Sequence, residues 1–396
     1  PIAASPAAPD FIDASRDIIA RDATGNLAMV VLEGGEVVAT HFVSAGETVD
    51  EHTLFQVASL SKWLTAWGVM TLVEEGRIGL DDPIEAHLER WSLPAGEFDS
   101  SGVTVRHLLS HTAGLGDGLG YNGFASRDAL QTLEESLSHP ADASPGSTGP
   151  VRLVREPGRD WAYSGGGYTL LQLLIEDVSG RPFDTFMKDE VFRPLGMQRS
   201  TFDLDEARRR GLAENYRQDG TAEPFRYYTA LAATSAFTSA ADLTAFLKAQ
   251  LPDARPRSNV LLADETLREM RHPHAAKLGA DIWGLGVMLY APNNQGDFII
   301  GHDGNNEPSI NTAVRFDPDT GDGIILLGTG NGLLATHLAS EWVFWKTGNV
   351  DNLMFAEGID GMIKTALTGV VILIVCGLLI ALVAGRRRAG STDGHA

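Results

Sequence analysis

The segment FQVASLSK, residues 55–62, decides the fold of this chain. It leads into a predicted helix that carries apolar residues at helical spacing and stops at Gly76. Ser59 and Lys62 are three residues apart, so both side chains lie on one face of that helix. A serine hydroxyl needs a neighbouring base to become nucleophilic, and helix N-terminal N–H groups can hold an oxyanion. Alone, the pattern also fits a helix-capping serine followed by a solvated lysine.

The composition restricts the class of protein. The chain has 396 residues, 43% of them hydrophobic, and a formal net charge of -21. These values are typical of a globular protein, and the length favours one large two-lobed domain or two domains. An acidic chain is repelled by phosphate backbones, which argues against a nucleic-acid partner. Cys376 is the single cysteine, which excludes an intramolecular disulfide framework and a thiolate metal site.

One strongly apolar segment lies near the C-terminus. Residues 365–384, TALTGVVILIVCGLLIALVA, carry no charge, and arginines follow at 386–388. At about 1.5 Å per residue, such a helix spans roughly the 30 Å core of a bilayer. The arginines favour a cytoplasmic C-terminus, which predicts a single-pass membrane protein with a periplasmic or extracellular catalytic domain. Because the chain begins at Pro1, we also expect that a signal peptide has been removed. The alternative is a buried core helix.

The rest of the sequence has an α/β pattern. We predict β-strands at 27–32, 36–43, 311–316 and 323–327, a helical middle with long loops at 85–250, and an amphipathic helix at 333–346. This order implies a sheet assembled from both ends of the chain, with a helical insertion between them. The predicted organisation is an N-terminal leader at 1–15, a domain at 16–350, a juxtamembrane linker at 351–364, a transmembrane helix at 365–384 and a cytoplasmic tail at 385–396.

Several further motifs carry a resemblance to a known family. They include EEGRIGLDDPI at 74–84, VTVRHLLSHTAGL at 103–115, YSGGGYTLLQLLIEDVSGRPF at 163–183 and GHDGNN at 301–306. With segment 55–62 they resemble the serine β-lactamase and penicillin-binding-protein superfamily, most of all its class C β-lactamase, D-aminopeptidase and β-lactamase-like esterase branch. The resemblance covers roughly residues 20–345. It implies an α/β, β-lactamase/transpeptidase-like fold, with an antiparallel sheet flanked by helices and a mostly helical subdomain, and chemistry without a metal or organic cofactor.

The resemblance also implies roles for individual residues. Ser59 would be the nucleophile, Tyr163 would work with Lys62 as the general base, and the N–H groups of Ser59 and Asn305 would hold the oxyanion. A phenol with an ordinary pKa near 10 can act as a base only if a cation favours its ionised form, and Lys62 is the candidate. The family's Y-x-N motif ends here in Gly165, so its usual side-chain amide is absent or supplied from elsewhere.

The family's K-T-G motif, on the strand beside the active site, has two candidates. Lys346-Thr347-Gly348 matches literally, but it ends the predicted amphipathic helix and is therefore rejected. His302-Asp303-Gly304 follows β-like residues and precedes the two late strands, which is the family's position. We assign His302, Gly304 and Asn305 to substrate and oxyanion binding, because a glycine there lets the strand backbone approach the substrate closely.

Two histidine pairs have spacings that could suggest a metal site. His107 and His111 are four residues apart, but the resemblance implies that their loop is structural and metal-free. His272 and His274 lack accompanying ligands. We therefore predict no metal site.

His302 in place of lysine removes a fixed positive charge, because histidine is mostly neutral at pH 7 unless a partner such as Asp303 raises its pKa. This weakens the case for an efficient β-lactamase or a carboxypeptidase. We predict a membrane-anchored, extracytoplasmic serine hydrolase that acts through an acyl-enzyme on a peptide or amide. The alternatives are a carboxylesterase or weak β-lactamase of the same fold, and a non-hydrolysing relative that binds peptide or cell-wall fragments. The expected partners are a small-molecule or peptide substrate and, through residues 365–384, the membrane.

Overall fold

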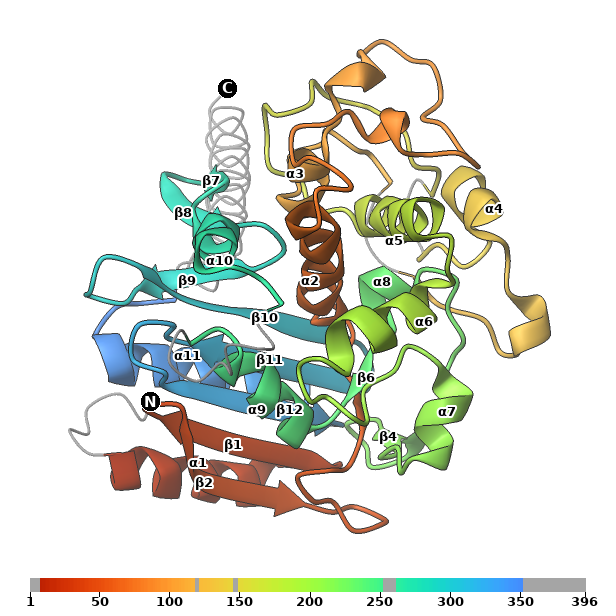
Figure 1. Cartoon of the computed structure of the whole chain (residues 1–396). Coiled ribbons are helices and arrows are strands. Elements are labelled where there is room, and N and C mark those ends of the chain that lie inside the picture. The colour runs from red at the N-terminus through yellow and green to blue at the C-terminus, as the bar shows by residue number, and fades with distance from the viewer. Residues whose placement is uncertain (1–7, 118–120, 145–148, 252–260, 352–396) are drawn as a thin grey trace, which may run out of the picture. The chain divides into compact units, whose positions relative to one another are not determined.

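The computed structural model describes residues 8–117, 121–144, 149–251 and 261–351 (Figure 1). The predicted transmembrane helix at 365–384 and its flanking segments lie outside these residues. Among the helices that are described, none combines the length and apolarity needed to cross a bilayer.

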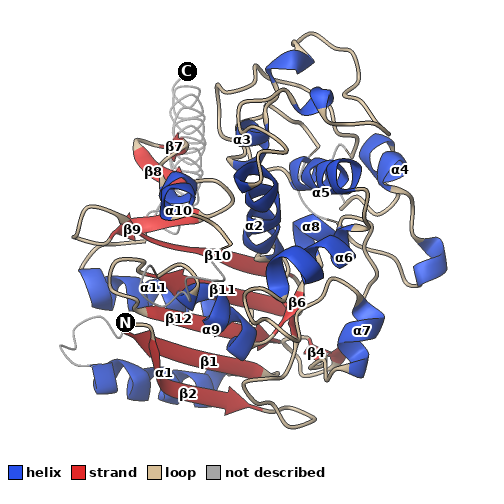
Figure 2. Ribbon diagram, in the orientation of Figure 1, coloured by secondary structure: helices blue, strands red, loops and turns tan. Residues whose placement is uncertain are grey.

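Eight strands form one antiparallel sheet in the described part of the chain, in the order β2-β1-β12-β11-β10-β9-β8-β7 (Figure 2). Their bounds are β1 Leu27–Glu33, β2 Glu36–Val43, β7 Ala275–Lys277, β8 Ala280–Trp283, β9 Met288–Pro292, β10 Phe298–Asn306, β11 Ile310–Phe316 and β12 Gly323–Thr329. The first strand pairs with the last one, with Leu27 opposite Gly328. The prediction that both ends of the chain build the sheet is therefore confirmed. The short strands β7 to β9 were not predicted.

Helices cover both faces of the sheet. On one face, α11 (Leu334–Thr347) packs on β11 and β12 with α1 (Ala8–Asp22) beside it, and Phe11 stacks on Trp345 with ring centroids 5.1 Å apart. On the other face, α9 (Ala240–Lys248) contacts β1 and β12 (Figure 1). The predicted leader at 1–15 thus differs from the structure, because the chain is helical from Ala8 and the apolar side chain of Phe11 is buried.

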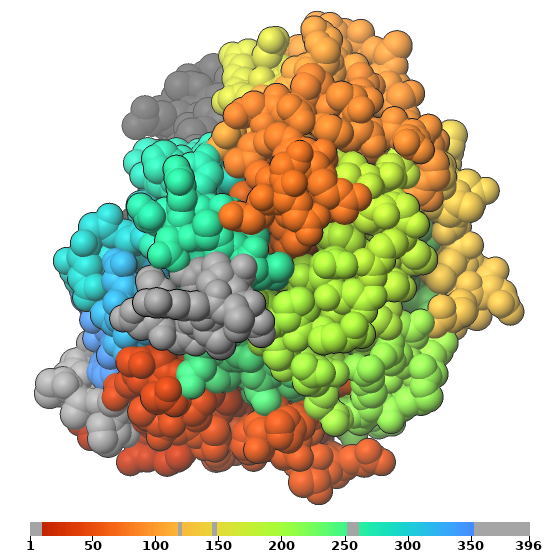
Figure 3. Space-filling model, viewed as in Figure 1, coloured from red at the N-terminus to blue at the C-terminus, as the bar shows by residue number. Residues whose placement is uncertain are grey.

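The regular structure in the middle of the chain is mainly helical, with long loops between the helices, as predicted, and it lies beside the sheet. In Figure 3 the red N-terminal residues and the cyan to blue residues up to 351 lie on one side of the view, and the yellow and green middle segments lie on the other. The helices are α2 Ser61–Glu74, α3 Val105–Leu109, α4 Leu133–Ser138, α5 Gly165–Ser179, α6 Phe183–Phe186, α7 Leu204–Arg209, α8 Leu231–Thr234 and α10 Asp264–Arg271. Two short strand pairs complete this part: β3 Phe55–Gln56 with β6 Phe237–Thr238, and β4 Asn215–Tyr216 with β5 Ala222–Glu223.

Helix α2 is a central core helix that begins just after Ser59. It is buried over most of its length, and the rings of Trp63 and Trp67 lie 4.9 and 5.1 Å from that of Phe246. Gly76 ends it in the left-handed conformation, with φ of 68°, as predicted from the sequence. Because α2 is packed on all sides, the position of its N-terminal end is fixed relative to β10, which it contacts.

Candidate active site

Ser59 lies in the tight turn that joins β3 to α2. The preceding residue, Ala58, has a left-handed backbone with φ of 44°, which is unfavourable for a residue with a Cβ atom. The turn is held from outside, because the Val57 N–H donates to the carbonyl of Ala236 at 3.0 Å. Ser59 itself is half-buried, so its hydroxyl stays accessible at the N-terminal end of a rigid helix.

Lys62 is the immediate partner of the Ser59 hydroxyl. Its Nζ lies 3.2 Å from Ser59 Oγ and donates to the carbonyl of Ala233 at 2.6 Å. Lys62 is only 2% exposed, and this burial lowers its pKa to about 7, although the nearby Asp117 carboxyl acts in the opposite direction. A large share of Lys62 is therefore a neutral amine near pH 7, within reach of the serine proton.

Tyr163 completes the group, but it is not an ionised phenol. Lys62 Nζ lies 4.8 Å from the centroid of the Tyr163 ring. Burial raises the pKa of Tyr163, and a hydrogen bond with the Ser59 side chain only partly opposes this shift. The expectation that Lys62 would favour the phenolate is therefore wrong, since desolvation outweighs the attraction of a lysine that is itself often neutral.

The imidazole ring of His111 packs against the ring of Tyr163. The imidazole lies against the Tyr163 ring with centroids 4.4 Å apart, and its Nδ1 accepts a hydrogen bond from the Ser164 N–H at 3.1 Å. Burial holds the pKa of His111 well below its usual range, so the ring is neutral. The family resemblance implied a structural loop here, and in the structure the His111 ring packs against that of Tyr163.

Asp117 is a site residue that the sequence did not indicate. Its carboxylate accepts hydrogen bonds from Ser164 Oγ at 2.5 Å and from the Gly166 N–H at 2.7 Å, at the start of α5. Burial raises its pKa. A single aspartate in a loop gives no sequence signal, because only the fold brings it to the segment that carries Tyr163.

Gly165 makes room for an aromatic ring. A Cβ atom at this position would lie 2.9 Å from Tyr121 Cε2, closer than real Cβ contacts occur. The hydroxyl of Tyr121 lies 3.1 Å from Thr169 Oγ1 on the same helix, α5. Tyr121 thus occupies the space beside the position where the family's motif carries asparagine.

His302 lies on β10, as predicted, and faces the nucleophile side of the sheet. It is 0% exposed, its Nδ1 lies 2.6 Å from the Asp303 carbonyl oxygen, and Trp283 packs edge-on at 5.5 Å between ring centroids. Burial, together with the nearby Lys62, lowers the pKa of His302 to about 3. His302 is therefore neutral, as the sequence had led us to expect in the absence of a carboxylate partner.

Only the backbone carbonyl of Asp303 acts to raise the pKa of His302, because the Asp303 carboxylate points to the other face of the strand. There its carboxylate pairs with the fully buried Arg315 at 2.5 Å, and Arg315 also pairs with Asp351 at 3.2 Å. Alternation along β10 thus separates the two side chains.

Gly304 lets β10 lie directly against the nucleophile segment. A Cβ atom there would lie 2.0 Å from the Val57 carbonyl oxygen, which also accepts a hydrogen bond from Thr312 Oγ1 at 3.1 Å. The next residue along β10, Asn305, is exposed. Lys346, by contrast, lies in the last turn of α11, at the end of the helix predicted there, and pairs with Asp322 at 2.8 Å.

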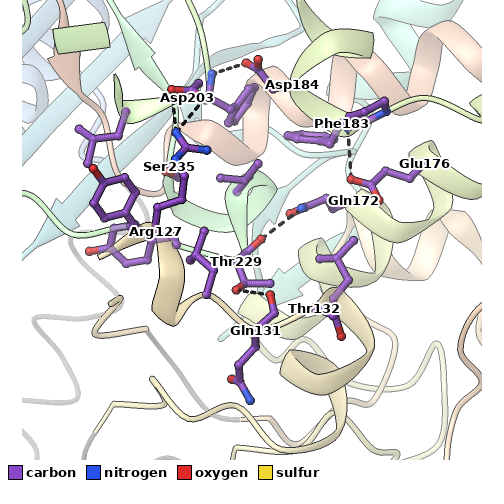
Figure 4. A pocket seen from close by; sticks show the side chains of 18 of the residues that line it. Arg127, Gln131, Thr132, Gln172, Glu176, Phe183, Asp184, Asp203, Thr229 and Ser235 are labelled. Carbon is purple, nitrogen blue, oxygen red and sulfur yellow. Dashed lines mark hydrogen bonds and ion pairs between the residues drawn. The ribbon is translucent and has the colours of Figure 1, made fainter. Parts of the chain in front are cut away.

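A cavity of about 620 Å³ lies elsewhere, among α4 to α7 (Figure 4). Its polar side chains pair with their neighbours: Arg127 with Asp203 at 3.0 Å, and Gln172 Nε2 with the Thr229 carbonyl at 3.1 Å. None of the site residues predicted from the sequence lines this cavity.

Comparison with known proteins identifies the family of this chain. The model of the β-lactamase family matches residues 13–341. Penicillin-binding protein 4* of Bacillus subtilis (strain 168) is 36% identical over 177 residues, which are 43% of this chain and 37% of that protein. The D-alanyl-D-alanine-carboxypeptidase/endopeptidase AmpH of Escherichia coli (strain K12) is 27% identical over 74% of this chain and 76% of its own length.

The fold is also found among solved structures. The octameric penicillin-binding protein homologue from Pyrococcus abyssi superposes with a TM-score of 0.70 at 25% identity, covering 86% of this chain and 78% of that one. The match to penicillin-binding protein 4* spans well under half of that relative, whereas the family model spans most of the described residues. The chain therefore belongs to the β-lactamase family of serine hydrolases.

Proposed function

We propose that this protein is a serine hydrolase that cleaves a peptide or amide bond through an acyl-enzyme formed on Ser59. The observation that carries the proposal is the 3.2 Å contact between Ser59 Oγ and the Nζ of Lys62, a buried lysine whose pKa is lowered to about 7. A neutral amine at this distance can accept the hydroxyl proton as the oxygen attacks a carbonyl carbon.

The remaining steps follow from the residues around this pair. In acylation the Ser59 Oγ–carbon bond forms, its proton passes to Lys62 Nζ, and the oxyanion is held by the N–H groups of Ser59 and Asn305. Tyr163, a neutral phenol hydrogen-bonded to Ser59, gives its proton to the leaving nitrogen as the carbon–nitrogen bond breaks, and regains one from Lys62. Water then attacks the acyl carbon while Lys62 takes one of its protons; the Oγ–carbon bond breaks, and Lys62 returns the proton to Ser59 Oγ.

A peptide or amide ranks first among substrates, because the carboxypeptidase/endopeptidase AmpH resembles this chain over most of its length. Ester hydrolysis is the second candidate, and the neutral His302 favours it, since the strand offers no fixed cation for a substrate carboxylate. β-Lactam hydrolysis ranks third, because the strand also lacks a fixed cation for the carboxylate of a β-lactam. We also propose that residues 365–384 anchor the chain in a membrane, with the catalytic domain periplasmic or extracellular; the support is their uncharged, apolar sequence before three arginines.

The test is covalent labelling of Ser59 followed by turnover. A fluorescent fluorophosphonate or penicillin-type probe should label the wild-type protein, and Ser59→Ala should lose the label while its melting temperature stays near that of the wild type. A panel of D- and L-peptides, esters and a β-lactam then ranks the substrates. Near wild-type turnover by Ser59→Ala would exclude the mechanism. If every acylating probe failed on a folded protein, the chain would instead be a non-hydrolysing relative that binds peptide or cell-wall fragments.

A further inference from the structure

The two N–H groups assigned to the oxyanion come from different segments of the chain. That of Ser59 belongs to the turn between β3 and α2, and that of Asn305 belongs to the end of β10. Two donors can hold one oxygen only if the distance between them is fixed, because a hydrogen bond weakens steeply once its length or angle departs from the ideal. The contacts that hold these two segments together therefore bear directly on catalysis.

The first contact between the two segments lies on one side of Asn305. Gly304 brings β10 against the Val57 carbonyl, and Thr312 Oγ1 on the neighbouring strand donates to the same oxygen at 3.1 Å. A strand end that is held at a single place can still pivot about it. Because Asn305 follows Gly304 toward the end of the strand, such a pivot would move its N–H relative to that of Ser59.

A second contact lies on the other side of Asn305 and passes through the hydroxyl of Tyr228. Asn306 Nδ2 donates to this hydroxyl at 3.1 Å, and the hydroxyl is also hydrogen-bonded to the side-chain amide of Gln56. A hydroxyl has one proton and two lone pairs, so it can serve both amides at once. All three side chains line one cavity of about 340 Å³. Tyr228 thus joins the residue that follows Asn305 to the residue that precedes Val57.

Tyr228 is itself held in place by its neighbours along the chain. It is only 5% exposed, and burial raises the pKa of its phenol, so the hydroxyl keeps its proton near neutral pH. On one side, the Phe124 N–H donates to the Tyr227 carbonyl at 2.7 Å, and the Tyr227 N–H donates back at 2.9 Å. On the other side, the Thr229 carbonyl accepts from Gln172 Nε2 of α5 at 3.1 Å. The hydroxyl therefore offers both segments a fixed point.

We propose that Tyr228 is a positioning residue of this site: its hydroxyl fixes the nucleophile segment relative to the end of β10, and so aligns the N–H groups of Ser59 and Asn305 on the oxyanion. This inference rests on the proposed acyl-enzyme function and adds a residue that the catalytic steps do not include. Tyr228 acts through Gln56 and Asn306 and exchanges no proton with the substrate.

The experiment removes only the hydroxyl and measures how well the oxyanion is held. The substrates are p-nitrophenyl pentanoate and its thiono analogue, in which sulfur replaces the carbonyl oxygen. Sulfur is larger and a weaker hydrogen-bond acceptor, so the thiono ester gains little from the two N–H groups. The ratio of kcat/KM for the oxygen ester to that for the thiono ester therefore reports the oxyanion contacts.

Tyr228→Phe should lower kcat/KM for the oxygen ester by about tenfold, which is less than the loss expected when a whole oxyanion donor is removed. The thiono ester should change by less than about twofold, because it depends little on the alignment of the two donors. The oxygen-to-sulfur ratio should therefore fall to about a tenth of the wild-type ratio. Comparing variant with wild type cancels the intrinsic reactivity of the two esters.

Tyr227→Phe is the matched control. This neighbouring hydroxyl is also hydrogen-bonded, since it donates to Asp205 Oδ1 at 2.8 Å and accepts from Arg208 at 3.1 Å, but both partners belong to α7. The variant should keep the wild-type rates and the wild-type ratio. Melting curves verify that both tyrosine variants are folded.

A double-variant cycle separates positioning from general damage. Asn306→Leu breaks the same link at its other end and should lower the oxygen-to-sulfur ratio as Tyr228→Phe does. Because both changes remove one link, the double variant should be no worse than the more damaging single variant. The inference is overturned if folded Tyr228→Phe keeps the wild-type ratio, if it slows both esters equally, or if the two losses multiply in the double variant.

Failure of this inference and failure of the proposed function give different results. Ser59→Ala tests the function alone, and it should reduce hydrolysis of the pentanoate ester to the spontaneous rate. If Ser59→Ala is inactive but Tyr228→Phe keeps the wild-type ratio, the acyl-enzyme stands and the positioning role is overturned. Hydrolysis that survives in Ser59→Ala, or a wild-type protein that hydrolyses neither ester, overturns both.

Discussion

Three side chains meet at the centre of this site. Ser59, Lys62 and Tyr163 lie in contact, and burial pushes the pKa of the lysine down while it raises that of the tyrosine. Near neutral pH the amine is thus the better proton acceptor and the phenol the better donor. The family resemblance implied that Lys62 and Tyr163 act together as the general base. Burial instead favours Lys62 as the proton acceptor and Tyr163 as the proton donor.

Acylation should depend on pH through Lys62. Because the neutral amine is the active form, the rate constant for fluorophosphonate labelling of Ser59 should rise with pH, with an apparent pKa of about 7, and level off above it. Below that value it should fall about tenfold per pH unit. Lys62→Arg, which cannot lose its proton near neutrality, should label at least about 100-fold more slowly. A rate that is flat between about pH 5 and pH 9 would rule out Lys62 as the base.

Restoring the family's asparagine should damage the site. Gly165→Asn places a side chain where Tyr121 already lies, with a Cβ contact of 2.9 Å, so the free energy of unfolding should fall by about 1–3 kcal/mol. In a protein that already carries Tyr121→Ala, Gly165→Asn should cost less unfolding free energy than it does in the wild type, because the ring that it would meet is gone. Urea denaturation of the four proteins in this cycle gives the coupling. Strictly additive losses would show that the ring and the glycine are unrelated.

Among the elements, β10 carries different chemistry on its two faces. His302 and Asp303 are neighbours in sequence, yet the first faces the nucleophile and the second pairs with Arg315 beneath the sheet. The ion pair between Asp303 and Arg315 thereby fixes the strand on one face, while the face that carries His302 and looks toward the nucleophile stays neutral. Gly304 then allows the strand to contact Val57, so that β10 and the nucleophile segment act as one rigid unit.

Removing the buried cation under β10 should therefore destabilise the protein strongly. Arg315→Met leaves two carboxylates, Asp303 and Asp351, buried without their main partner, and we expect a loss of about 3–5 kcal/mol in urea unfolding. Arg127→Met is the matched control. It removes an exposed pair with Asp203 and should cost no more than about 1 kcal/mol. Equal losses in the two variants would contradict the assignment of Arg315 as the support of the strand.

The sequence predicted the elements that have strong local patterns. The first hairpin, α2, the late strands and α11 were located within a few residues, and the position of His302 on a strand followed from them. The features that the sequence did not predict depend on contacts between distant parts of the chain or lack a recognisable local pattern. Asp117 has no local signature, and β7 to β9 are too short for a period to be recognised. The pKa order of Lys62 and Tyr163 depends on burial, which a sequence does not reveal.

For the molecule as a whole, the decisive test is how the chain associates with membranes. If residues 365–384 span a bilayer, the full chain, expressed with a signal peptide in a bacterium, should sediment with membranes and resist carbonate extraction. A version ending at Asp351, which keeps the buried pair with Arg315, should remain in the supernatant and still label at Ser59. Carbonate release of the full chain would show peripheral attachment and refute the membrane span.

The pairing of β1 with β12 has a consequence for biogenesis. Leu27 and Gly328 are neighbours in the sheet although about 300 residues separate them. At roughly 5–20 residues per second, synthesis leaves the first hairpin waiting for about 15–60 s before its partner strand exists. A lone hairpin is marginally stable, and the apolar run from Leu27 to Leu32 would present an open strand edge throughout that interval. Folding of this chain should therefore depend on a holding chaperone that shields its first fifty residues until the last strand has been synthesised.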